Sequence, residues 1–168
     1  MKALFVLLAL LGATSLGIAA QIVTVDDVGV SIEIPDDWMR SEKDTFGTVI
    51  APKGEENKKI RIHLTSHKGV PPVEAVQRSA EKIDEIRSER GHRPEQVISS
   101  TPITSETGIS GQKAIVGQQG IDGPPYLNRY YFERSDGRIF CVCVYHYGDS
   151  KFSSDAEQMI IATLSLKK

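Results

Sequence analysis

The chain has 168 residues, of which 40% are hydrophobic and 25% are charged. Its 20 basic and 22 acidic residues give a formal net charge of −2 at pH 7, and the basic residues are scattered along the sequence. Such a balance gives no electrostatic reason to bind nucleic acid or anionic lipid, so neither is expected as a partner.

The start of the chain predicts export. Lys2 supplies a positive charge, residues 3–11 form an unbroken apolar run, and small residues follow as far as Ala20. This order is typical of a secretory signal peptide, with cleavage between Ala20 and Gln21. An uncleaved membrane anchor is the alternative, but glycine, serine and threonine dilute the second half of the apolar stretch.

We therefore expect a removed signal peptide at 1–20 and a single domain at 21–168. About 150 residues suit one hydrophobic core, whereas two domains would each be small. The mature protein is then periplasmic or secreted, and it has no membrane span of its own after cleavage.

Alternating residues predict strands in the first part of the mature chain. Apolar and polar residues alternate at 30–34 and again at 60–65, which is the pattern of half-buried strands. Apolar runs at 22–25 and 46–51 predict two more, and together the four segments indicate an antiparallel meander. The acidic pair before Trp38 predicts a turn at 36–38.

Trp38 is the only tryptophan of the chain. Packing as a lid on the edge of the sheet is one interpretation. The other is an anchor for a ligand or partner, because aromatic side chains are favoured at the centres of interfaces.

One long helix is predicted to follow the early strands. Proline is accepted in the first turn of a helix, so Pro71 and Pro72 mark its start, and Gly91 marks its end as a left-handed cap. Glu74 and Arg78 are placed to pair on its outer face. The apolar stripe expected to face the sheet comprises Val73, Val76, Ala80 and Ile83, with Ile86 beside it.

Strands at 97–107 and 112–119 are predicted next, followed by a loop at 121–126 and an aromatic hairpin. Asp136 and Gly137 suggest a two-residue turn between the hairpin strands. That turn would pair Phe132 with Cys141, Tyr130 with Cys143, and Asn128 with Tyr145. Both faces of the hairpin are more apolar than a solvent-facing surface requires, so we expect both to be covered.

The C-terminal segment is predicted to be a helix that covers one face. Ser154 and Glu157 have the spacing of a capping box at its start. The stripe expected to face the sheet comprises Ala156, Met159, Ile160, Thr163 and Leu164.

Cys141 and Cys143 lie two residues apart on a predicted strand. Their side chains then share one face at a spacing of about 6–7 Å, whereas a disulfide needs Cβ atoms roughly 3.8 Å apart. We expect buried, reduced thiols that behave as small apolar core residues. A redox or soft-metal role and an intermolecular bridge are the alternatives.

No motif for catalysis or metal binding stands out. His63 and His67 are about 13 Å apart if both lie on one strand, so they cannot share a metal ion. The serine between Gly108 and Gly111 lacks the spacing of a nucleophile elbow, and a hairpin turn explains it better. No catalytic residue, metal site or cofactor is therefore expected.

Three features in this order resemble the PsbP-like family, whose fold is shared with a nuclear-transport regulator that binds the small GTPase Ran and with bacterial periplasmic proteins. They are the strand that leads through Pro35 into Trp38, the amphipathic helix after the early strands, and the aromatic hairpin before a terminal helix. The resemblance implies an α+β fold with a central antiparallel sheet of about six or seven strands and helices packed on both faces. It also implies a binding or assembly factor, since most members are of that kind.

The first hypothesis is therefore an exported, non-catalytic binding or assembly protein that acts on an envelope or secreted protein. Its expected contact residues are Trp38, Ile121, Asp122 and Tyr126, together with the edge of the hairpin. A hydrolase whose acid–base groups converge from separate loops is the second hypothesis. The third is a thiol- or copper-handling protein that uses Cys141 and Cys143.

Overall fold

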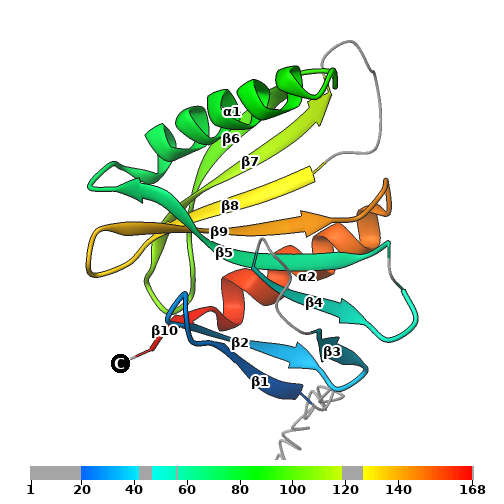
Figure 1. Cartoon of the computed structure of the whole chain (residues 1–168). Helices are drawn as coiled ribbons and strands as arrows, with labels where there is room; N and C mark the ends of the chain where they lie inside the picture. The colour runs from blue at the N-terminus through cyan, green and yellow to red at the C-terminus, as the bar shows by residue number, and fades with distance from the viewer. Residues whose placement is uncertain (1–19, 42–46, 56, 119–126, 168) are drawn as a thin grey trace, which may run out of the picture.

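The computed structural model describes residues 20–41, 47–55, 57–118 and 127–167. They form a large antiparallel sheet, a small antiparallel sheet and two helices (Figure 1). Within these residues, no helix combines the length and the apolar character needed to cross a membrane.

The large sheet has seven strands, and every neighbouring pair is antiparallel. Their order across the sheet is β3 (Trp38–Arg40), β4 (Thr48–Pro52), β5 (Lys59–Lys68), β9 (Arg138–Tyr145), β8 (Leu127–Glu133), β7 (Ser110–Gln118) and β6 (Glu95–Thr104). The hairpin of β8 and β9 is thus central, flanked by β7 and β5. The expectation that this hairpin offers a free edge was wrong, because both of its strands already have two neighbours.

The first two strands do not join the large sheet. β1 (Ala20–Val25) and β2 (Val30–Pro35) pair with each other, and the short β10 (Ser165–Leu166) pairs with the other side of β2. The alternation predicted at 30–34 is confirmed, since Val30, Ile32 and Ile34 are fully buried. The prediction that all four early segments form one meander was wrong for β1 and β2, which belong to the small sheet. Trp38 begins β3 instead of lying in the preceding turn.

The hairpin register differs by one residue from the prediction. Arg134 N–H donates to the carbonyl of Arg138, and Gly137 N–H donates to that of Arg134, so residues 135–137 form a three-residue loop. Gly137 has a positive φ of 75°, as the last residue of such a loop requires. The observed pairs are Phe132 with Phe140, Tyr131 with Cys141, Tyr130 with Val142, Arg129 with Cys143 and Asn128 with Val144.

The first helix, α1 (Pro72–Glu89), begins where proline predicts it, and Gly91 follows it with a φ of 68°. Glu74 accepts a hydrogen bond from Arg78 Nε at 2.9 Å, as expected for this spacing. Its buried face is rotated from the predicted stripe. Val73 is 56% exposed, whereas the buried residues are Ala75, Val76 and Ala80.

The second helix, α2 (Ser150–Thr163), begins before the predicted capping box. Its cap is Asp149, whose side chain accepts a hydrogen bond from Phe152 N–H at 2.9 Å. Ser154 therefore lies inside the helix, and Glu157 instead accepts a hydrogen bond from Tyr130 Oη at 3.1 Å. The buried residues of α2 are Phe152, Ser153, Ala156 and Ile160.

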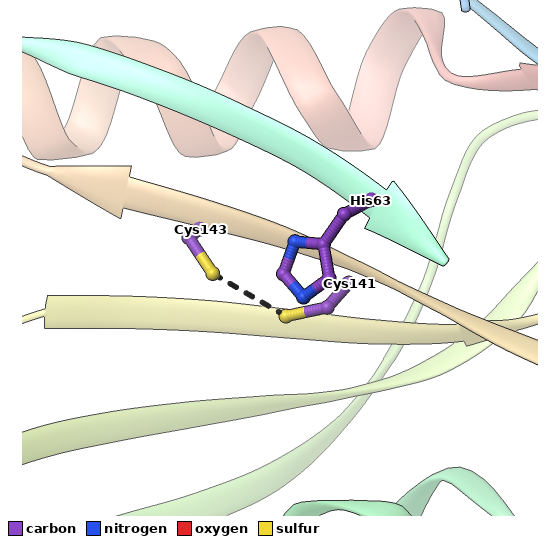
Figure 2. A group of neighbouring side chains, drawn as sticks. All are labelled: His63, Cys141 and Cys143. Carbon is purple, nitrogen blue, oxygen red and sulfur yellow. Dashed lines mark hydrogen bonds between the residues drawn. The ribbon is translucent and has the colours of Figure 1, made fainter. Parts of the chain in front are cut away.

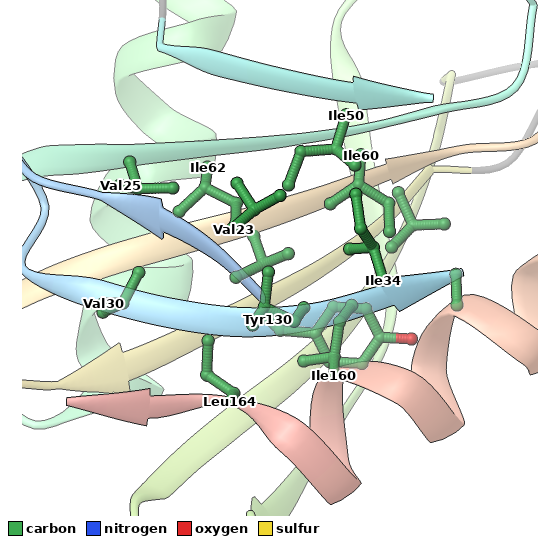
Figure 3. Packing of buried hydrophobic residues seen from close by; sticks show 14 of the residues in the cluster. Val23, Val25, Val30, Ile34, Ile50, Ile60, Ile62, Tyr130, Ile160 and Leu164 are labelled. Carbon is green, nitrogen blue, oxygen red and sulfur yellow. The ribbon is translucent and has the colours of Figure 1, made fainter. Parts of the chain in front are cut away.

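Two hydrophobic clusters lie on opposite faces of the large sheet. Successive side chains of a strand point to opposite faces, so β9 contributes residues to both clusters. Phe140, Val142 and Val144 join the larger cluster, between the large sheet, the small sheet and α2. Figure 3 shows its interior, where Ile160 of α2 lies against Tyr130 of β8. Ile139, Cys141 and Cys143 join the smaller cluster beneath α1, whose other members are Ala75, Val76, Ala114, Val116 and Tyr131. The predicted α+β sheet with helices on both faces is confirmed.

Candidate functional site

A cavity of about 310 Å³ lies between α1 and the large sheet. Polar and charged side chains of β5, β8 and β9 line it on the sheet side, and α1 contributes Ser79, Ile83 and Ile86. The sheet residues are Arg61, His63, Arg129, Tyr131, Cys141, Cys143 and Tyr145. This hollow therefore brings two thiols, an imidazole, two guanidinium groups and two phenol groups together.

The two cysteines and His63 meet at the wall of this cavity (Figure 2). The sulfur atoms of Cys141 and Cys143 are 3.5 Å apart, and both residues are buried as free thiols. His63 is opposite Cys141 in the ladder between β5 and β9. A nitrogen of its ring and the two sulfurs all lie within 4.8 Å of one another.

Two arginines flank Cys143 from the neighbouring strands. Arg129 of β8 and Arg61 of β5 are both directly opposite it in their ladders. Arg129 donates two hydrogen bonds to the carboxylate of Glu95, at 2.7 and 2.9 Å, and both side chains are about nine-tenths buried. Arg61 donates to Tyr145 Oη at 2.9 Å. The thiols thus lie beside buried positive charge.

The surroundings act differently on the two thiols. Burial raises the pKa of Cys141, which keeps its proton. The hydrogen bond from Cys141, together with the charges of Arg129 and Arg61, lowers the pKa of Cys143. Burial also raises the pKa of Tyr145 to about 12. Cys143 is thus the more acidic of the two thiols, and two cysteine sulfurs beside an imidazole are a donor set suited to soft metal ions.

Sequence reasoning missed the place of His63 in this cluster. The local pattern put the two cysteines on one face of a strand, but His63 joins them only through the pairing of β5 with β9, strands far apart in the sequence. No local spacing encodes that pairing. The alternation of Arg61, His63 and Thr65 with apolar residues was the one available signal, since it placed His63 on the less apolar face.

The other histidines are dispersed. His67 Nε2 and Ser79 Oγ are 3.0 Å apart, and His92 is exposed beyond the end of α1. His146 is 7% exposed, and neither ring nitrogen has a hydrogen-bond partner in the structure. It shares a hollow beside α2 with Glu157, whose carboxylate is paired with Lys113. Such dispersal gives little support to a hydrolase whose histidines converge in one deep pocket.

Trp38 lies on the other side of the molecule. Its ring stacks on Phe152 of α2, with the ring centroids 5.3 Å apart, and only 7% of the residue is exposed. It lines a groove of about 430 Å³ between β2 and α2. The apolar lining includes Ile34, Pro35, Met159 and Ala162, and the charged residues are Glu33, Lys151 and Asp155.

The remaining predicted site residues divide into two groups. Ala20 lines the same groove, and Gln21 Nε2 donates to the carbonyl of Trp38 at 2.9 Å, so the predicted cleavage position lies beside Trp38. Ile121, Asp122 and Tyr126 lie outside the described residues.

Comparisons with known proteins bear on the fold. No family model matches the sequence, and no curated protein matches it. The solution structure of cyanobacterial PsbP (CyanoP) from Synechocystis sp. PCC 6803 is similar, with a TM-score of 0.64 and 11% identity over 89% of this chain and 93% of that one. A crystal structure from Bacteroides thetaiotaomicron VPI-5482 has a TM-score of 0.46 and 17% identity, over 84% of this chain and 46% of that one. The fold is PsbP-like, which confirms the resemblance seen in the sequence.

Proposed function

We propose that the protein is an exported, non-catalytic binding or assembly factor that docks on another protein of the cell envelope. The observation that carries the proposal is the PsbP-like fold, which extends over 89% of this chain and 93% of cyanobacterial PsbP. The family that the sequence resembles consists mostly of binding and assembly factors. A fold hosts many functions, so the docking surface has to be argued from its own residues.

The export step rests on the leader at 1–20. Cleavage after Ala20 would leave Gln21 as the first residue, and all of β1 except its first residue would stay in the small sheet. The N-terminal sequence of the protein recovered from its host cell tests this step. Gln21 is the expected first residue, and recovery of Met1 would contradict cleavage.

The groove beside Trp38 is the proposed docking surface. Its apolar side chains, among them Met159 and Ala162 of α2, can receive an apolar side chain of a partner, while Lys151 and Asp155 supply charge of both signs. An apolar centre with a polar rim is the usual anatomy of protein interfaces. Segment 121–126 is the second surface that we propose for contact, through Ile121, Asp122 and Tyr126.

Site-specific photocrosslinking in the native envelope tests this surface. A photoreactive residue at position 158 or 162 of α2 faces the groove, because Gln158 and Ala162 line it. Matched control positions are Val73 on α1 and Ile98 on β6, which are exposed apolar residues elsewhere on the molecule. Position 122 tests the second surface in the same way.

One envelope protein crosslinked from position 158 or 162, and not from 73 or 98, is the expected result. The same adducts from all positions would indicate non-specific capture and would contradict a groove-directed partner. Crosslinks from position 122 alone would move the docking surface to the second segment. No adduct from any position would remove the support for an assembly role.

A further inference from the structure

The cluster of His63, Cys141 and Cys143 is not explained by a docking function. It lies beneath α1, on the face of the large sheet opposite the groove of Trp38. Buried cysteines can pack as small apolar residues, but packing alone does not require a half-buried imidazole beside both sulfurs. Their convergence on one wall of a cavity therefore calls for a separate interpretation.

The donor set selects for a soft metal ion. Thiolate ligands favour Cu(I) and Zn(II), and imidazole suits both ions. Two thiolates on one metal, each at about 2.3 Å, lie about 3.7–4.0 Å apart. The sulfurs of Cys141 and Cys143 are already 3.5 Å apart, so binding requires them to separate by only a few tenths of an ångström. A ring nitrogen of His63 lies within 4.8 Å of both sulfurs and completes a three-ligand set.

The number of ligands distinguishes the two ions. A structural zinc site almost always has four protein ligands in a tetrahedron. Among the described residues, the group of possible ligands here comprises His63, Cys141 and Cys143 alone. Three ligands suit a trigonal monovalent ion, and soft sulfur ligands select Cu(I) for that role.

The charges around the cluster point the same way. Arg129 and Arg61 face Cys143 from the two neighbouring strands, and Glu95 is paired with Arg129. Two thiolates and one Cu(I) carry one net negative charge, which the two positive side chains opposite Cys143 stabilise. Two thiolates and a divalent ion carry no net charge, so the arginines would stabilise that complex less.

We propose that His63, Cys141 and Cys143 form a binding site for a single Cu(I) ion, reached through the cavity beneath α1. The two sulfurs and the imidazole nitrogen are its ligands, and Arg61 and Arg129 lie opposite Cys143 on the neighbouring strands. This site lies apart from the proposed docking groove, and its test is independent of any protein partner.

The experiment is an anaerobic titration of the purified protein with Cu(I), in competition with the chelator bicinchoninate. The expected result is one Cu(I) per chain, and X-ray absorption at the copper edge should show two sulfurs and one nitrogen at bonding distance. The protein should retain Cu(I) in the presence of an equal concentration of Zn(II). Failure to compete with the chelator, preference for Zn(II), or a copper spectrum without sulfur would each overturn the proposal.

Variants assign the ligands. Cys141→Ala and Cys143→Ala should each weaken Cu(I) binding by at least about a hundredfold, and His63→Gln by at least about tenfold. His67→Gln is the matched control, since His67 lies on the same strand and is hydrogen bonded to Ser79. Circular dichroism shows whether each variant is folded. His63 is only partly buried, so His63→Gln is expected to fold. This variant therefore tests the proposal even if a cysteine variant does not fold. Unchanged affinity in His63→Gln would exclude the imidazole ligand.

Discussion

Arg129 and Glu95 form an ion pair in which each side chain is removed from water, with 8% and 10% of their surfaces exposed. Taking two charges out of water is costly, and the cost is recovered only while both partners are present with good geometry. The two parallel hydrogen bonds supply that geometry. The pair also fixes Arg129 beside Cys143, so the charge of the cavity wall depends on β6, the strand that contributes Glu95.

Breaking this pair should therefore destabilise the protein strongly. Glu95→Gln leaves the guanidinium of Arg129 buried without its counter-charge, and we expect a loss of about 3 kcal/mol in the free energy of unfolding, measured by urea denaturation. Arg129→Met should cost a similar amount. The double variant should lose less than the sum of the two, and additive losses would contradict a coupled pair.

His146 makes stability depend on pH. Burial lowers its pKa from the ordinary value of 6.5, and the negative charge of Asp149 opposes the shift only in part. The unfolded chain therefore takes up a proton at a higher pH than the folded protein does. Above about pH 7 this residue has no effect on stability. As the pH falls below 6.5 towards the folded pKa, the free energy of unfolding should decrease.

Urea denaturation between pH 7.5 and pH 5 measures the effect. His146→Gln has no titrating group at this position, so its free energy of unfolding should fall less steeply over that range. Val73→Ala changes an exposed residue without a titratable group and should retain the slope of the unmodified protein. Burial also lowers the pKa of His67, so part of the slope should remain in His146→Gln. An unchanged slope in that variant would show that His146 does not titrate in this window.

At the scale of the element, the start of α2 depends on Asp149. Its carboxylate accepts the hydrogen bond from Phe152 N–H and pairs with Lys58 Nζ at 2.9 Å, and the backbone bond is the main reason that its pKa is lowered. Asp149→Ala should lower the free energy of unfolding by about 1 kcal/mol. Asp149→Asn keeps a cap but loses the charge, so its cost should be smaller.

Ser154→Ala is the matched control for this cap. Because Ser154 is exposed inside the helix, the substitution should change stability by no more than about 0.5 kcal/mol. The reverse order, with a large loss for Ser154→Ala and none for Asp149→Ala, would favour the capping box suggested by the sequence. Thermal and urea denaturation both resolve a difference of this size.

Local signals predicted the elements well, and the reason is physical. Proline at 72 and glycine at 91 act within a few residues of themselves, so the bounds of α1 follow from the sequence. The hairpin also follows, but its register depends on whether two or three residues form the turn. A shift of one residue in the register moves every side chain of a strand to the other face relative to its partner. The prediction therefore placed Tyr130 and Phe132 on the same face as the two cysteines, whereas the observed register places them on the opposite face.

The arrangement of distant strands could not be predicted in this way. The alternation of Val30, Ile32 and Ile34 with polar residues predicts a strand. Nothing near these residues in the sequence indicates that this strand pairs with Ser165–Leu166. The same limit applies to the cluster beneath α1, since His63 meets Cys141 only through the order of the sheet. Local patterns determine which residues share a face. Long-range pairing determines which faces meet.

On the scale of the whole molecule, α1 and α2 differ in how much apolar surface each buries against the large sheet. The buried residues of α1 are the small side chains Ala75, Val76 and Ala80, and a cavity lies beneath the helix. α2 buries Phe152 and Ile160 in the larger cluster. The free energy of burial scales with apolar area, so α1 is held less firmly.

Native-state hydrogen exchange should reveal this difference. Amides of α1 should exchange through a local opening, at a lower free energy than those of α2 and of the central strands β8 and β9. Mass spectrometry of peptides covering each element measures the order. Exchange of α1 and β9 in one cooperative step would show instead that the layer beneath α1 is as firmly held as the rest.

The small sheet joins the two ends of the described chain. Ser165 and Leu166 pair with β2, Lys167 N–H donates to the carbonyl of Gly29, and Lys167 Nζ pairs with Asp26, 141 positions earlier. During translation β1 and β2 leave the ribosome long before the residues that complete their sheet. One side of β2 must therefore remain without its partner until β10 has been made. Completion of the small sheet is therefore a late event in the maturation of the chain.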